Sequence, residues 1–166
     1  MAAAVTLTYV TKLTVVETLG TNVPGAEEVN ARVTHDKFNA NLSLKGDTSV
    51  PVAKVAVFQK ALAAGTATVD LTALAGTNGA AVDLTGLKVQ AVKFRNPATN
   101  LNSITVKFGA ASGYLLGGAA WSFILEPGME IVAFGNDKTP DVDGTHKNID
   151  LAGTGTQALD VVIVAG

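Results

Sequence analysis

Alternation of apolar and polar residues is the dominant pattern along this chain. In the segment 6–18 the apolar residues of one parity are Leu7, Tyr9, Leu13 and Val15. A period of two residues is typical of a strand with one buried face. The pattern therefore predicts one long strand over residues 6–18, and the Asn, Pro and Gly residues that follow predict a loop over residues 19–30.

Further segments alternate, or are continuously apolar, between turn residues. They are residues 38–45, 87–94, 104–108, 121–125, 129–134 and 159–164. The phase of alternation switches within 87–94, which indicates a bulge or a strand covered on both sides. Glu126-Pro127-Gly128 has the residue order of a type II turn. Residues 159–164 are apolar on both faces, which indicates a central strand or one covered by another subunit.

Residues 52–64 are ambiguous. Val55, Gln59 and Leu62 have helical spacing, whereas Val55 to Phe58 form a good strand run. We favour a strand, with a short helix as the alternative.

Many short strands with regular turn signals predict an all-β fold, an antiparallel β-sandwich or jelly-roll-like domain. Residues 1–30 are expected to form an N-terminal strand or arm and a loop, and residues 31–166 the sandwich. The expected core includes Phe38, Leu42, Val89, Ile104, Val106, Phe108, Phe123, Leu125, Ile131 and Val162.

Composition narrows the function classes. Only 16% of the 166 residues are charged, which favours an oligomer because little polar material is left to cover an isolated sandwich. The net charge of -2 gives no electrostatic case for a nucleic-acid or membrane partner. Without cysteine there are no disulfides and no thiolate metal sites. No apolar run is long enough for a membrane span, and the start does not resemble a signal peptide.

Aspartates recur in a short repeat. Val69-Asp70-Leu71-Thr72 returns as Val82-Asp83-Leu84-Thr85, and Ile149-Asp150-Leu151 is a looser third copy. We interpret these aspartates as acceptors of backbone hydrogen bonds in turns at strand ends, rather than as a catalytic carboxylate pair.

Other candidate motifs are weak. Residues 153–158 match a dinucleotide fingerprint formally, but the eight residues after Ala158 predict a strand and not the required helix. His35 and His146, the two histidines, have no recognised ligand or catalytic spacing. The oxygen-rich loop 136–144 has the wrong register for an EF-hand, so a solvated turn is favoured over a cation site.

Aromatic residues offer one alternative. Trp121, Tyr9 or Tyr114 could stack on a sugar, although the alternation around Trp121 favours the core. Asn41-Leu42-Ser43 is a glycosylation sequon without any sign of secretion. We therefore predict no catalytic, cofactor-binding or metal-binding residues, no cofactor, and a protein that is not an enzyme.

The chain resembles small virion structural proteins of tailed bacteriophages over roughly residues 62–166. The stretches that carry the resemblance are LAAGTATVDLTAL (62–74), VDLTGLKVQAVKFRNPATNLNSITVKFGAASGYLL (82–116), FILEPGMEIV (123–132) and IDLAGTGTQALDVVIVAG (149–166). The shared features are an Ala-, Gly- and Thr-rich, cysteine-free, β-rich sequence with a TN-x-x-x-ITV strand and a Pro-Gly turn. Residues 1–61 lie outside the resemblance.

The resemblance implies a virion protein assembled in the host cytoplasm, with a capsid decoration (cement) protein as the leading expectation. Its partners would be further copies of itself, with a trimer favoured over a dimer, and the major capsid protein or other virion proteins. The alternative is a tail, baseplate or fibre-tip module that binds host surface carbohydrate.

Overall fold

A computed structural model describes residues 5–12, 15–18, 32–35, 40–76 and 79–166. Within these residues all regular structure is β-strand, so the predicted all-β class is confirmed. The strands are β1 (Thr6–Thr11), β2 (Val15–Thr18), β3 (Arg32–His35), β4 (Ala40–Lys45), β5 (Lys54–Ala61), β6 (Thr66–Asp70), β7 (Leu74–Ala75), β8 (Ala81–Val82), β9 (Val89–Arg95), β10 (Ile104–Phe108), β11 (Ser122–Leu125), β12 (Glu130–Phe134), β13 (Asn148–Ala152) and β14 (Ala158–Ala165).

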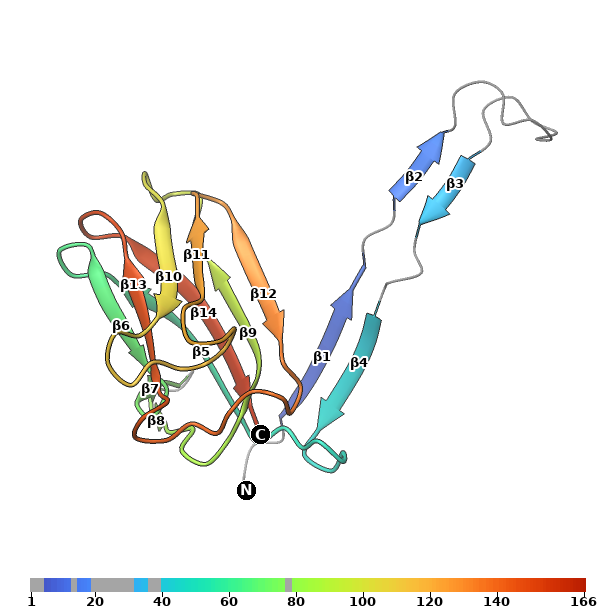
Figure 1. Ribbon diagram of the computed structural model, residues 1–166, viewed down its shortest axis with the longest axis horizontal. Coiled ribbons are helices and arrows are strands. Elements are labelled where there is room, and N and C mark those ends of the chain that lie inside the picture. Colours follow the sequence, from blue (N-terminus) through green and yellow to red (C-terminus); the bar gives the residue numbers. More distant parts are fainter. Residues whose placement is uncertain (1–4, 13–14, 19–31, 36–39, 77–78) are drawn as a thin grey trace. The chain divides into compact units, whose positions relative to one another are not determined.

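Two four-stranded antiparallel sheets form the sandwich (Figure 1). Sheet I has the order β12-β9-β14-β5, and sheet II has the order β11-β10-β13-β6. In each of the consecutive pairs β5 and β6, β9 and β10, β11 and β12, and β13 and β14, one strand lies in each sheet. This alternation between two sheets is the order of a jelly roll. β14 is a central strand, which is one of the two alternatives that its apolar faces indicated.

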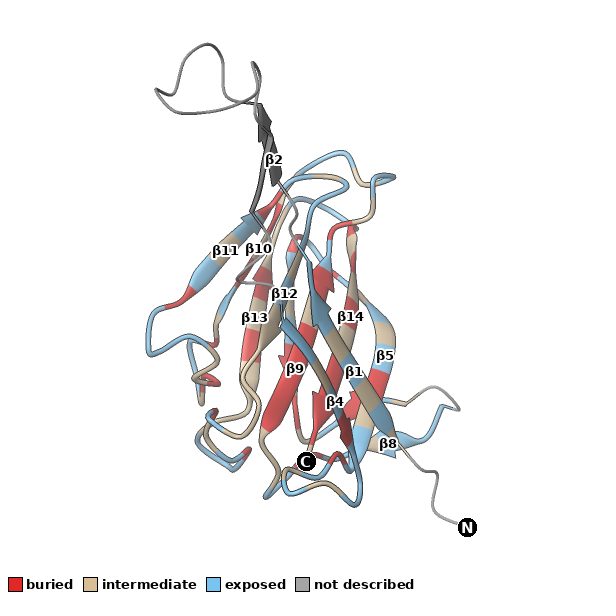
Figure 2. Ribbon diagram, turned by 90° about the vertical axis from the view of Figure 1, so that its right-hand side faces the viewer, coloured by how far each residue is buried: buried red, intermediate tan, exposed pale blue. Residues whose placement is uncertain are grey.

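The main core lies between the sheets, and Figure 2 shows long buried stretches in β9, β13 and β14. Of the predicted core residues, four are at most 2% exposed: Val89, Ile104, Val106 and Leu125. Three more are partly buried and pack against the core: Phe108, Phe123 and Ile131. Alternation therefore identified the inner face of β10 and β11 correctly.

Two residues of the predicted core were wrong, and a third lies outside the described residues. Val161 and Ile163 face the core, whereas Val162 lies on the opposite face of β14 and is partly exposed. Because this strand is apolar on both faces, its parity could not be read from the sequence. Leu42 is partly exposed in β4, where Leu44 is buried instead, and Phe38 lies outside the described residues.

Several local predictions are confirmed. The ambiguous segment 52–64 contains the strand β5 and no helix. The phase switch in β9 is a bulge, because Val164 pairs with Ala91 and the next residue, Ala165, pairs with Val89. At the Pro-Gly turn, Gly128 has φ +87° and Met129 N donates to Glu126 O at 2.9 Å.

The chain divides into two compact units, Thr8–Ser43 and residues 1–7 together with 44–166. β2 pairs with β3 within the smaller unit, and β1 pairs with β4, two strands that each extend past the bounds of this unit. The prediction of one continuous strand over residues 6–18 was wrong, because Lys12 lies outside both β1 and β2. The expected loop over residues 19–30 lies outside the described residues, and the expected domain boundary after residue 30 stays a prediction. In the described part of the chain, no helix is long and apolar enough to cross a bilayer.

Candidate functional site

The outer face of sheet II is the face of its four strands that points away from the core. Its side chains form two rows across the four strands, in the order β11, β10, β13, β6. The first row is Ile124, Thr105, Ala152 and Thr66, and the second row is Ser122, Lys107, Asp150 and Thr68. All eight side chains are exposed or partly exposed, and most are small. This arrangement follows from the pleat, because the residues between them, such as Val106 and Leu151, point into the core.

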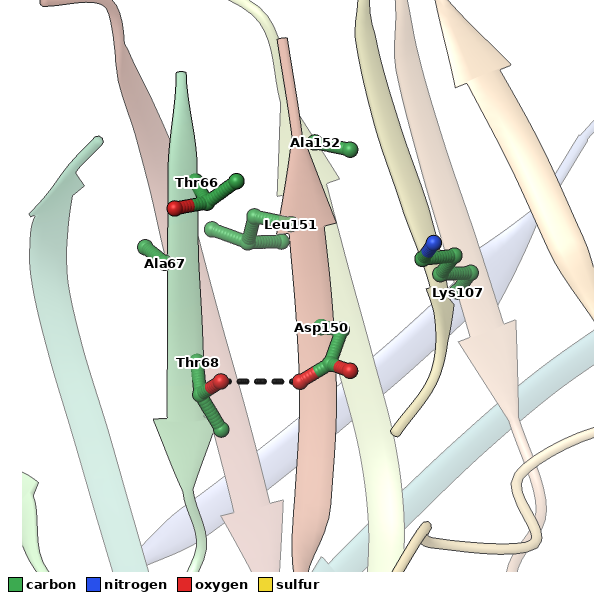
Figure 3. Close-up of a pocket in the computed structure, with 7 residues that line it drawn as sticks. All are labelled: Thr66, Ala67, Thr68, Lys107, Asp150, Leu151 and Ala152. Atoms are coloured by element: carbon green, nitrogen blue, oxygen red, sulfur yellow. Dashed lines mark hydrogen bonds between the residues drawn. The ribbon is translucent and has the colours of Figure 1, made fainter. Parts of the chain in front are cut away.

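A shallow depression of about 230 Å³ lies in this face, between β6, β13 and β10 (Figure 3). Thr68 Oγ1 donates to Asp150 Oδ1 at 2.8 Å, and Ala110 N donates to the second carboxylate oxygen at 2.8 Å. Lys107 is the direct cross-strand neighbour of Asp150, yet its Nζ has no ion-pair partner among the described residues. The depression thus places a fixed carboxylate beside an unpaired ammonium group, among hydroxyl and methyl groups.

The repeated aspartates act as predicted at two of their three positions. Asp70 Oδ1 accepts hydrogen bonds from Thr72 N (2.9 Å) and Thr72 Oγ1 (2.7 Å), and Asp83 binds Thr85 in the same way. The third copy was wrong, because Asp150 lies within β13 and binds across strands. The third turn of this kind is instead made by Asp143, which accepts from Thr145 N and Oγ1. The spacing Asp-x-Thr, rather than the flanking apolar residues, is the feature that the three turns share.

Acid should weaken the protein partly through Asp70. Burial alone would raise the pKa of this carboxyl, but hydrogen bonds from Lys147 Nζ (2.7 Å) and Thr72 together hold it below its ordinary value. A lowered folded-state pKa stabilises the fold above the ordinary aspartate pKa of about 3.9, and this stabilisation is lost as the pH falls through the folded-state value. We expect Asp70→Asn to be less stable than the wild type at pH 7 and to lose less stability between pH 5 and pH 2. Denaturant unfolding at a series of pH values measures this, with Asp47→Asn at an exposed position as the control; equal acid sensitivity of Asp70→Asn and the wild type would contradict it.

The carboxylates of the loop 136–144 are engaged by hydrogen bonds and ion pairs with groups of the protein itself. Asp143 accepts from Thr145 and from His146 N (2.7 Å), and the Thr145 hydroxyl is the largest cause of a pKa well below the ordinary value. Asp137 lies 2.9 Å from Lys138 Nζ, and Asp141 lies 3.9 Å from Lys88 Nζ. Among the described residues no three His, Asp or Glu side chains converge as metal ligands. The hydrogen bonds around Asp143 make this part of the loop a turn, and the absence of a cation site stays a prediction.

His146 is not arranged as a catalytic base. Its Nδ1 lies 3.2 Å from Asp143 Oδ1 and 3.0 Å from Thr145 Oγ1. A catalytic histidine binds its orienting carboxylate through one ring nitrogen and the nucleophile through the other, whereas both groups meet the same nitrogen here. The hydrogen bonds among Asp143, Thr145 and His146 therefore stabilise the conformation of this loop. The backbone of His35 lies in β3, and the surroundings of its side chain are outside the description.

The fingerprint-like segment 153–158 is a turn between β13 and β14. Gln157 accepts from Thr154 N at 2.8 Å through its Oε1 and donates to Asn102 O at 2.5 Å through its Nε2. Gly155 has φ +69°, and strand β14 begins at Ala158. No helix follows, so the match to the dinucleotide motif is accidental, as predicted.

Two of the three aromatic residues considered for sugar binding, Tyr114 and Trp121, are buried. Tyr114 is fully buried, and its hydroxyl donates to Pro140 O (2.8 Å) and accepts from Val89 N (3.1 Å). Trp121 is 7% exposed and donates from Nε1 to Tyr114 O at 2.9 Å. Neither ring can offer a face to a sugar. Tyr9 is partly buried in β1, and Asn41 of the sequon is exposed in β4.

Sequence reasoning missed that Lys107 and Asp150 are neighbours across β10 and β13. Each residue stood on the polar face of a predicted strand, but nothing in the sequence said that the two strands are neighbours. Comparison of the chain with protein families, curated proteins and solved structures found no match. The surface itself therefore carries the functional argument.

Proposed function

We propose that this protein is a non-enzymatic structural protein of a tailed-bacteriophage virion, bound to the head as a decoration (cement) protein. Its partners are the major capsid protein and further copies of the chain, with a trimer preferred over a dimer because capsid lattices offer three-fold sites. The observation that carries the proposal is the exposed outer face of sheet II, on which five of the eight side chains are Ala, Ser or Thr. Such side chains lose little rotamer entropy when they are ordered in a contact.

Two further features support this function. The jelly-roll order of the two sheets is an architecture used by viral capsid domains, which is support by analogy of fold. The polar groups that sequence patterns singled out are engaged in turns and loop anchors, as shown by Asp70, Asp83, Asp143 and Tyr114. Turns and loops that are held by hydrogen bonds suit a decoration protein, because its task is to add contact area to an existing lattice.

The alternative is a tail or fibre-tip module that binds host carbohydrate, and the geometry supports it less. Trp121 and Tyr114, two of its three aromatic candidates, are buried and hydrogen-bonded. Lectin-like sites need an aromatic face that is open to the sugar.

Quantitative mass spectrometry of purified phage particles, together with labelled antibody in electron micrographs, tests the proposal. We expect this protein in hundreds of copies per particle, distributed over the head. A few copies at the tail would replace the decoration function by the attachment function. A protein that is abundant in infected cells and missing from particles would contradict both.

A further inference from the structure

We infer that the outer face of sheet II binds the same face of a second copy of this chain around a two-fold axis. The face consists of the two rows defined above, centred on Lys107 and Asp150. This inference does not depend on the virion proposal, because it concerns only the association of two copies in solution. Of the partners proposed above, this face would bind a further copy of the chain, and the major capsid protein and a three-fold arrangement would use other surfaces of the protein.

The residues of the face are complementary to themselves. When two four-stranded sheets face each other across an axis that is parallel to the strands and lies between β10 and β13, each β10 meets the β13 of the other copy. Each β11 then meets the opposite β6. A rotation about such an axis does not change the position of a residue along the strand direction. Each row therefore faces the same row of the second copy.

In this arrangement Lys107 faces Asp150 of the second copy, and Asp150 faces Lys107 in return. Ser122 and Thr68 face each other, Thr105 faces Ala152, and Ile124 faces Thr66. The register that produces these pairs is fixed by the ladders of β10 with β11 and with β13, and of β13 with β6. Packed sheets lie about 10 Å apart, a gap that a lysine and an aspartate side chain can bridge together.

The charges on the face also favour a second copy over other partners. Lys107 Nζ has no ion-pair partner among the described residues, while the carboxylate of Asp150 is held in place by Thr68 and Ala110. One positive and one negative charge sum to zero, so the face does not attract a polyanion or an anionic lipid surface. Ile124 is 63% exposed on a face of otherwise small or polar residues, and it would be covered in the contact.

Charge reversal tests this contact sharply. Lys107→Glu sets a carboxylate against Asp150 of the second copy, and Asp150→Lys sets two lysines against each other. Sedimentation velocity up to hundreds of micromolar should show that each variant alone dissociates at least about tenfold more readily than the wild type. A mixture of the two variants should form a heterodimer, because opposite charges then face each other at both places. Asp150 of the first variant faces Lys107 of the second, and the two substituted residues face each other with their signs exchanged.

Controls separate association from folding. Lys138→Glu makes the same change in net charge at an exposed loop position and should leave association unchanged. Asp150→Lys loses the hydrogen bonds to Thr68 and Ala110 and could fail to fold for that reason. In that case Thr105→Arg takes its place. In each copy the arginine would clash with Ala152 of the other copy and should weaken the dimer. A wild type that stays monomeric, a Lys107→Glu variant that associates like the wild type, or two folded charge variants that fail to combine would each overturn the inference.

Discussion

Val106→Asp should destabilise the protein by about 4 kcal/mol or more, which for a domain of this size is close to complete unfolding. Val106 is fully buried in β10, between β11 and β13, and its side chain lies in the main core. An aspartate there would have to ionise without a partner in an apolar environment or remain protonated at a cost in free energy. Neither option leaves the core packing intact.

Denaturant unfolding followed by circular dichroism measures this effect. Val132→Asp is the matched control, because Val132 is 51% exposed on β12 and the substitution is chemically the same. The control should cost less than about 1 kcal/mol. Similar losses in the two variants would mean that β10 does not face the core, and the sandwich described above would be wrong.

The contrast between these two valines shows what alternation can and cannot predict. In β10 the polar residues Thr105 and Lys107 flank Val106, so the inner face was evident from the sequence. In β14 the run from Val161 to Val164 is apolar at every position, so no pattern in the residues themselves places Val161 inside rather than Val162. The burial of β14 follows from its central place in sheet I, which depends on pairing with β5 and β9.

Structure that depends on neighbouring residues in the sequence was predictable, whereas structure that depends on contacts between distant segments was not. The turns at Asp70 and Asp83 were predictable, because an aspartate two residues before a threonine can satisfy that residue's N–H and hydroxyl without any other part of the chain. The order of strands in the two sheets was not predictable, since it joins segments far apart in sequence. The neighbourhood of Lys107 and Asp150 depends on that order, and so does the only self-complementary face we identify among the described residues.

Asn96→Asp should be the second strongly destabilising change, with a loss of about 3 kcal/mol or more at pH 7. Asn96 is fully buried, and its Nδ2 donates to Leu125 O (2.8 Å) and Asn102 O (3.1 Å). Its Oδ1 accepts from Asn100 Nδ2 at 2.6 Å. The substitution keeps the shape of the side chain and replaces a double donor by an oxygen that faces two carbonyl oxygens.

The loss should depend on pH in a defined direction. Burial and the two carbonyl oxygens disfavour the charged form, so the new carboxyl should have a folded-state pKa above the ordinary aspartate value of about 3.9. The folded variant then binds more protons than the unfolded chain at intermediate pH, and its stability relative to the wild type falls as the pH rises above about 4. Below that pH the protonated carboxyl can donate to one of the two carbonyls, and part of the loss is recovered.

Unfolding of both proteins at pH 3.5 and pH 7 measures the difference, with Asn102→Asp at an exposed position in the same loop as the control. A loss that is the same at both pH values would show that the new carboxyl is not forced to ionise in a buried site, and that the amide of Asn96 does not anchor this loop to β11.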